Sequence, residues 1–311
     1  MTASFHVEHA TRASRIGTAA FAVAVVLLAA APAWGGRDDL RLLSEIYAYV
    51  ALASLWNLLA GYAGLVSVGQ QAYVGLGGYV LFASTIEAGV HPLLAVPVAG
   101  AVAAVVALPV AGLLFRLRGH YFAIGTWVVA EVFRLIASQI SALGGGSGTS
   151  LPAAIVTEMA SSRQMREFLI YWLALALVVV VLAAIVLLLR SRYGLALTAI
   201  RDNELAARSN GVDVTRTKLV VYVLTAFVIF ITVIGGIGRV EGPIIGTVVF
   251  FVLRQTLADL GSLYLLMLGA VAIAVMLLAP KGIWGFLAER FGWQLLPLER
   301  RLRFAADART T

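Results

Sequence analysis

The sequence predicts an all-α protein that crosses a membrane several times, and three observations carry that prediction. The chain of 311 residues is 61% hydrophobic and has a mean hydropathy of +0.95. Only 13% of its residues are charged, whereas soluble domains average about 25%. Nine apolar segments approach the roughly 20 residues that a helix needs to cross the hydrocarbon core. We therefore expect a polytopic helical membrane protein with eight or nine hydrophobic segments.

The candidate spans are separated by loops whose charge indicates their side of the membrane. The spans are 17–36, 42–60, 64–86, 93–115, 119–140, 168–189, 218–234, 243–258 and 262–279. Arg12 and Arg15 precede the first, which we interpret as a span rather than a cleavable signal peptide. Cytoplasmic loops are rich in Lys and Arg. We therefore expect a cytoplasmic N-terminal tail at 1–16, a cytoplasmic loop at 190–217 and a cytoplasmic C-terminal tail at 281–311.

The number of spans conflicts with this charge distribution near the C-terminus. Three crossings after residue 217 would leave the C-terminal cations outside, although the membrane domain, 17–280, should end in the cytoplasm. Segments 218–234 and 243–258 are short for spans and are joined by a glycine-rich stretch. One re-entrant segment there removes the conflict, since irregular backbone is tolerated at membrane depth where protein buries it. A missing piece of sequence removes it equally well.

A polar loop stands between two long apolar runs. Residues 190–218 carry six cations and three anions. From Leu195 to Ala207 there is no Gly or Pro, and good helix formers dominate. Leu195, Ile200 and Leu205 can share one broad face of a helix. We predict one short amphipathic helix at the cytoplasmic surface, on which a protein outside the membrane docks.

Small and polar residues gather in two of the apolar segments. Six glycines lie within 61–79, where they serve either tight helix packing alone or the lining of a solute path, and a broken or kinked helix suits both. Within 119–140, Glu131 and Arg134 are spaced i, i+3 and can pair. Pairing offsets a cost of about 2.5–3.5 kcal/mol per charge at mid-membrane, and a structural bridge is an open alternative to a pathway role. The candidate path residues are Ser67, Gln70, Gln71, Tyr73, Thr126, Glu131 and Arg134.

Several kinds of chemistry are excluded by what the sequence lacks. Without cysteine it has no disulfide, thiolate metal site or cysteine nucleophile. It has no G-x-x-x-x-G-K-[ST] motif to hold ATP phosphates, and its four histidines form no H-x-x-x-H pair. Much of the net charge of +7 lies in the polar loop and the C-terminal tail, which favours anionic lipid over nucleic acid. We expect no catalytic residue, no metal ligand and no cofactor bound by the chain.

Five motifs follow one another along the chain. They are LWNLLAGYAGLVSVGQQAYVGLGGY (55–79), RLRGHYFAIGTWVVAEVFRL (116–135), LGGGSGTS (143–150), RSRYGLALTAIRDNELAARSNGVDVTRTKL (190–219) and GGIGRVEGPIIG (235–246). In this order they resemble the permease subunits of branched-chain amino acid ABC transporters of the LivM type. The resemblance spans most of residues 40–280.

The resemblance implies a subunit of an importer in the inner membrane of a bacterium. Its partners would be a second homologous permease, two cytoplasmic ATPases that use ATP and Mg²⁺, an extracytoplasmic solute-binding protein and the lipid bilayer, with no nucleic acid. In such permeases a short helix of the cytoplasmic loop sits in a groove of the ATPase. The residues matched to that role are Arg201, Asp202, Glu204, Ala206, Ala207 and Gly211, with Glu204 one place earlier than the strict pattern.

The chain departs from the family pattern after Phe227. About 30 residues are absent there, which is room for a loop and most of one crossing of about 20 residues. The conflict between the number of spans and the charge distribution arises in the same region. The expected function is import of branched-chain or other hydrophobic amino acids. Open alternatives are a urea or amide ABC permease, an ion-coupled carrier that uses Glu131 and Arg134, and an inactive shortened permease.

Overall fold

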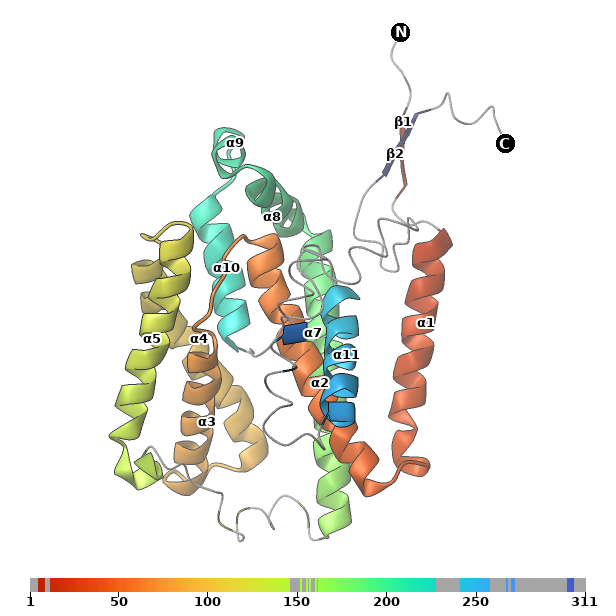
Figure 1. Ribbon diagram of the computed structural model, residues 1–311, viewed down its shortest axis with the longest axis vertical. Helices are drawn as coiled ribbons and strands as arrows, with labels where there is room; N and C mark the ends of the chain where they lie inside the picture. Colours follow the sequence, from red (N-terminus) through yellow and green to blue (C-terminus); the bar gives the residue numbers. More distant parts are fainter. Residues whose placement is uncertain are drawn as a thin grey trace.

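The computed structural model describes residues 5–8, 12–145, 162–227, 241–257 and 301–304, with isolated residues at 152–160 and 267–271. This part of the chain is helical apart from a two-stranded ribbon, in which β1 (Phe5–Glu8) pairs antiparallel with β2 (Arg301–Phe304). The long helices lie side by side, and the ribbon lies beyond one end of them (Figure 1). The predicted all-α architecture of a polytopic membrane protein is confirmed.

Among the described residues, five helices are long and apolar enough to cross a membrane. They are α1 (Arg12–Ala29), α2 (Arg37–Asn57) with its continuation η2 (Leu58–Tyr62), α4 (Pro92–Leu114), α5 (His120–Ser138) and α7 (Arg163–Arg190). Each overlaps one predicted span, namely 17–36, 42–60, 93–115, 119–140 and 168–189. Hydropathy alone was sufficient to predict these five helices.

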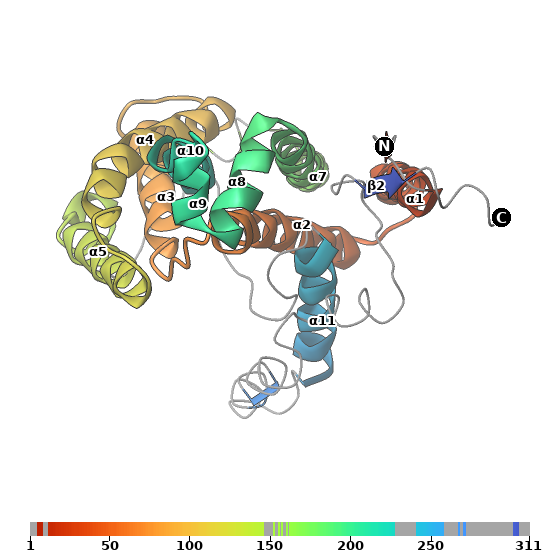
Figure 2. The same cartoon turned by 90° about the horizontal axis from the view of Figure 1, so that it is seen from above.

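Three shorter helices complete the bundle. They are α3 (Gln71–Ile86), α10 (Val214–Phe227) and α11 (Glu241–Leu257), with 16, 14 and 17 residues. At 1.5 Å per residue α3 does not reach the roughly 30 Å of a hydrocarbon core. α10 packs with α3 and α4, whereas α11 packs on α2 (Figure 2). The predicted re-entrant turn falls largely on residues 228–240, and most of the ninth segment, 262–279, also lies outside the described residues.

The centre of the bundle is the packing of α2 on α7. Tyr47 of α2 and Tyr171 of α7 are buried, and their hydroxyls share a hydrogen bond of 2.9 Å. The Tyr171 hydroxyl also donates to the carbonyl oxygen of Leu28, which ties α1 to the same core. On α4, alanines at intervals of four residues are buried, and such small residues let helices approach closely. They are Ala95, Ala99, Ala103, Ala107 and Ala111.

The predicted span 64–86 is not one helix. After η2 the chain runs without regular structure from Ala63 to Gln70, and α3 begins only at Gln71. Gly64 turns the backbone with a φ of +68°, a conformation that glycine adopts without steric cost. A continuous helix was therefore the wrong prediction for this stretch, whereas a helix broken within 61–79 is confirmed. We call residues 63–70 the irregular segment.

Candidate functional site

The polar loop between α7 and α10 folds into two helices, α8 (Arg192–Asp202) and α9 (Glu204–Ser209). Asn203 separates them with an extended backbone, and its side-chain oxygen accepts a hydrogen bond of 3.0 Å from the Ala206 amide. Asn is favoured at such N-caps because it satisfies an otherwise unpaired helix donor. The prediction of a single helix is therefore wrong. We call residues 192–211 the connector; in Figure 1 it lies at the end of the bundle where the β1–β2 ribbon also lies.

The connector separates apolar side chains that the sequence grouped on one face. Ile200 and Ala207 are buried in one small core. Leu205 is 78% exposed and Leu195 is 53% exposed. The predicted shared face of Leu195, Ile200 and Leu205 is wrong: Leu195 and Ile200 are five residues apart on α8 and therefore point in different directions, and the extended residue Asn203 separates Leu205 from that helix. Two apolar side chains are thus left on the outer surface of the connector.

Ion pairs hold α9 against the start of α10. Glu204 accepts hydrogen bonds from Lys218 at 2.7 Å and from Arg208 at 2.9 Å. The hydrogen bond from Lys218 lowers the pKa of the Glu204 carboxyl below its ordinary value, and partial burial opposes that shift. Glu204 is also the first residue of α9, where a negative charge interacts favourably with the helix dipole. Gly211 ends the connector with a φ of +80°, which glycine adopts freely.

The six residues expected to contact an ATPase occupy two kinds of position. Those on the outer surface are Arg201, Asp202, Ala206 and Gly211. Those that hold the connector in shape are Glu204 and Ala207. The exposed Leu205 lies among the first group and presents the apolar area that a docking surface requires.

The connector rests directly on the helices of the bundle. α8 packs on α7, on α10 and on η2. Leu197 of α8 is fully buried and belongs to the main core. Because η2 leads into the irregular segment without a break, α8 is in packed contact with the helical turn that directly precedes that segment.

Besides the backbone hydrogen bonds at its two ends, the irregular segment is held by two hydrogen bonds that involve side chains and by one close approach of backbones. The Trp56 indole donates to the carbonyl oxygen of Ser67 at 2.8 Å. The Val68 amide donates to the Thr126 hydroxyl of α5 at 3.1 Å. Gly69 lies so close to α5 that a Cβ there would be 1.8 Å from the carbonyl oxygen of Thr126. In this conformation Thr126 is buried and anchors the segment.

Two polar side chains of the irregular segment are buried without a hydrogen-bond partner. Ser67 and Gln70 are each 2% exposed, and the Ser67 hydroxyl and both atoms of the Gln70 amide contact no partner within the described part of the chain. An unpaired buried polar group costs about 1–3 kcal/mol, so each one calls for an explanation. Three residues further on, the hydroxyls of Tyr73 and Tyr222 share a hydrogen bond of 3.1 Å that joins α3 to α10. The broken helix thus carries unused donors and acceptors inside the bundle.

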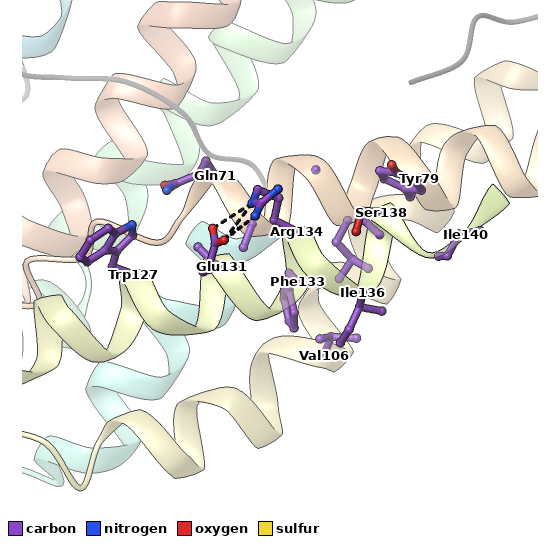
Figure 3. Close-up of a pocket in the computed structure, with 15 residues that line it drawn as sticks. Gln71, Tyr79, Val106, Trp127, Glu131, Phe133, Arg134, Ile136, Ser138 and Ile140 are labelled. Carbon is purple, nitrogen blue, oxygen red and sulfur yellow. Dashed lines mark hydrogen bonds and ion pairs between the residues drawn. The ribbon is translucent and has the colours of Figure 1, made fainter. Parts of the chain in front are cut away.

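A cavity of about 530 Å³ opens between α3 and α5 (Figure 3). Gln71 and Tyr79 of α3 line it, as do Trp127, Glu131 and Arg134 of α5. The Arg134 Nε lies 2.9 and 3.0 Å from the two carboxylate oxygens of Glu131, so the predicted i, i+3 pair forms. The rest of the wall is mainly apolar and includes Leu76, Val106, Phe133, Ile136 and Ile140.

The predicted path residues form two groups, one buried in the bundle and one on the cavity wall. The buried group is Ser67, Gln70, Tyr73 and Thr126, and the cavity group is Gln71, Glu131 and Arg134. The sequence did not predict that Trp127 lies on the cavity wall or that Leu205 faces outward. No pattern in the sequence distinguishes these two residues from the other apolar residues around them. Across the described ranges, no three His, Asp or Glu side chains are grouped so as to hold a metal ion.

Membrane-spanning helices around a broken helix with polar groups and a cavity are the architecture of a membrane transport protein. Residues 40–228 match the family of the permease component of branched-chain amino acid transport systems, and the chain belongs to this family. The family consists of transport permease subunits rather than enzymes.

Two relatives carry the same description. The LivM permease proteins of the high-affinity branched-chain amino acid transport systems of Salmonella typhimurium (strain LT2) and Escherichia coli (strain K12) are each 27% identical to the chain over 314 positions, which cover 83% of this chain and 73% of each relative. Because 83% of a 311-residue chain is fewer than 314 residues, the relatives carry residues in the aligned region that this chain lacks. The family match ends at residue 228, next to the predicted departure after Phe227. No solved structure matches the chain.

Proposed function

We propose that the chain is a translocation subunit of an ATP-driven importer for branched-chain or other hydrophobic amino acids. The importer contains a second homologous permease, two cytoplasmic ATPase subunits and an extracytoplasmic solute-binding protein, and it resides in the inner membrane of a bacterium. ATP and Mg²⁺ bind to the ATPase subunits, because this sequence has no phosphate-binding motif of its own. The family match and the two LivM relatives support the solute class.

The observation that carries the proposal is the two-sided connector. Its outer surface presents Leu205 for docking, and its inner surface buries Ile200 and Ala207. An ATPase that closes on ATP moves the outer surface, and the contacts of α8 with η2 and α10 transmit the movement into the bundle. The irregular segment follows η2 directly, so the movement changes the environment of Ser67 and Gln70.

The solute path in this proposal runs beside the broken helix. Ser67, Gln70, Gln71, Tyr73 and Thr126 supply hydrogen-bond donors and acceptors without fixed charge. When the irregular segment shifts, the unpartnered groups of Ser67 and Gln70 become available to the solute or to water. Binding along this path is weak, because the soluble binding protein supplies the selectivity.

The test is a change confined to the outer surface of the connector. Leu205→Asp removes apolar burial worth about 1.5–3 kcal/mol at a docked interface, so we expect ATP-driven leucine uptake to fall at least about tenfold. Leu205→Met is the matched control and keeps uptake, since it retains an apolar side chain of similar size. Ala207→Arg is a poorer probe because Ala207 is buried within its own chain.

The measurement is uptake of labelled leucine into vesicles that contain the two permeases and the ATPases, with the binding protein added outside. Chain levels in the membrane show that both variants insert normally. Uptake that persists without the ATPase subunits and follows an ion gradient would replace the importer with an ion-coupled carrier. Normal uptake by Leu205→Asp would remove the connector from the coupling route.

A further inference from the structure

The cavity between α3 and α5 holds a charged pair near the middle of the membrane. Glu131 follows the first residue of α5 by 11 positions, which places it about 16 Å along the helix and near half the depth of a roughly 30 Å core. The side chains of Glu131 and Arg134 are 50% and 64% exposed. Intramembrane charges face a bundle interior or a water-filled path rather than lipid. The cavity is therefore part of a polar route or an enclosed interface of the assembled importer.

We propose that Glu131 and Arg134 bind the charged head of a free α-amino acid, whose apolar side chain lies along the wall of the same cavity. This inference rests on the proposed function and specifies where the amino acid is recognised within the permease. An α-amino acid carries a carboxylate and an ammonium on one carbon atom. These groups complement a guanidinium and a carboxylate that stand side by side on one helix face.

The hydrogen-bonding capacity of the pair leaves room for both ends of such a ligand. Arg134 contacts Glu131 through Nε and Nη2, whereas a guanidinium has five N–H donors in a planar fork. Arg134 lines the cavity, so a carboxylate there can bind its remaining donors in the bidentate manner that Arg favours. The ammonium then donates to Glu131. The Arg134–Glu131 pair stays intact, two charge-assisted contacts are added to it, and no covalent bond changes.

The wall of the cavity supplies the second half of the recognition. Leu76, Phe133 and Ile136 offer apolar surface beside the pair, and burial of apolar area favours an aliphatic side chain. The volume of about 530 Å³ lies within the range of about 300–1,000 Å³ that is typical of small-molecule sites. Gln71 and Ala72 at the start of α3 also line the cavity, and the positive end of that helix dipole favours the carboxylate.

The charges also bear on the choice of solute. A pair that is neutral as a whole binds a zwitterion that is neutral as a whole, so binding at this site moves no net charge. An uncharged solute such as urea offers neither a carboxylate to the remaining donors of Arg134 nor an ammonium to Glu131. The site therefore selects a zwitterionic amino acid over an amide.

Because this chain contains no cysteine, a single introduced cysteine is the only thiol of the chain, and its labelling is measured on the band of this chain. Ser138→Cys places a thiol on the cavity wall. Val128→Cys is the control, because Val128 lies on α5, is 54% exposed and is not part of that wall. The rate of reaction with a membrane-permeant maleimide is measured in vesicles that contain the assembled importer. L-leucine should slow the reaction of Ser138→Cys about tenfold at saturation and leave that of Val128→Cys unchanged.

Ligand analogues and charge variants test the role of the pair. We expect no protection by 4-methylpentanoate, which lacks the ammonium, or by 3-methylbutylamine, which lacks the carboxylate. In the Ser138→Cys background, the double variant Glu131→Gln/Arg134→Gln keeps hydrogen-bonding groups but removes both charges, and half-protection should require about tenfold more leucine or higher. Arg134→Lys keeps the positive charge, so its leucine concentration for half-protection should rise less than that of the double variant. An unchanged maleimide rate without leucine shows that the variants fold.

Several outcomes overturn this inference. They are no protection by leucine up to its solubility limit, equal protection by 4-methylpentanoate or urea, and full protection in the double variant. ATP-driven leucine uptake by the same vesicles separates this result from the proposed function. Uptake without protection would refute the binding site but not the importer function. Protection without uptake would refute the importer function but not the binding site.

Discussion

Replacing Gly69 with alanine tests how the broken helix is held against α5. A Cβ at this position would lie 1.8 Å from the carbonyl oxygen of Thr126, and Cβ contacts below 3.0 Å essentially do not occur. The two backbones must therefore separate by at least 1.2 Å. Overpacking typically costs about 1–3 kcal/mol, and loss of the hydrogen bond from the Val68 amide to Thr126 adds about 1 kcal/mol. We expect Gly69→Ala to destabilise the chain by about 2–4 kcal/mol.

The assay is thermal unfolding of the detergent-solubilised importer, with leucine uptake measured in parallel. A chain of this size loses about 2 °C per kcal/mol, so the midpoint should fall by about 4–8 °C. Gly77→Ala is the matched control, because a Cβ at Gly77 of α3 meets nothing within 4 Å and alanine stabilises a helix interior by about 0.5–1 kcal/mol over glycine. Equal midpoints and equal uptake for the two variants would refute the close approach of Gly69 to Thr126.

Three further predictions address the buried polar groups and the connector. Gln70→Met removes two unpartnered atoms, so we expect it to raise the free energy of unfolding by about 1–3 kcal/mol and to lower leucine uptake. Full uptake in a stabilised variant would show that the amide has no role in transport. We expect Tyr73→Phe and Tyr222→Phe each to lower the free energy of unfolding by about 1 kcal/mol. Because the two hydroxyls bond to each other, the double variant should lose less than the sum of the two single losses. Strict additivity would contradict the pairing. Glu204 has a lowered pKa because Lys218 donates a hydrogen bond to it. The ion pair therefore contributes fully to the stability of the fold above the ordinary carboxyl pKa of about 4.5, and this contribution is lost as the pH falls through the lowered value. The pH dependence of wild-type unfolding should exceed that of Glu204→Gln in this range, and identical profiles would argue against the ion pair.

The helices that cross the membrane could be predicted because their signal is local. About 20 consecutive apolar residues suffice to identify a span, and five of the nine predicted segments coincide with long helices. The pairing of Glu131 with Arg134 was equally accessible, because residues three apart on a helix are neighbours. The helix break within 61–79 was expected from its glycines, although the boundaries of α3 were not.

The folding of the connector was predicted incorrectly at one residue. The stretch from Leu195 to Ala207 contains no Gly or Pro, so one continuous helix was predicted, with Leu195, Ile200 and Leu205 on one broad face. Asn203 stops α8 and caps α9 instead, since its side chain competes for backbone donors. Helix propensity alone does not reveal this break, which also places Ala207 in one small core with Ile200.

The sequence by itself determined that the chain is a helical membrane protein of this transporter family, that a polar connector interrupts its spans, and that one acidic and one basic side chain meet within α5. Only the tertiary structure decided that Gln70 is buried while Gln71 faces a cavity, that Thr126 anchors the irregular segment, and that Leu205 faces outward. The physical reason is the range of the interactions. Hydropathy and i, i+3 spacing act between neighbours in the chain, whereas burial and backbone contact depend on segments that meet only when the helices pack.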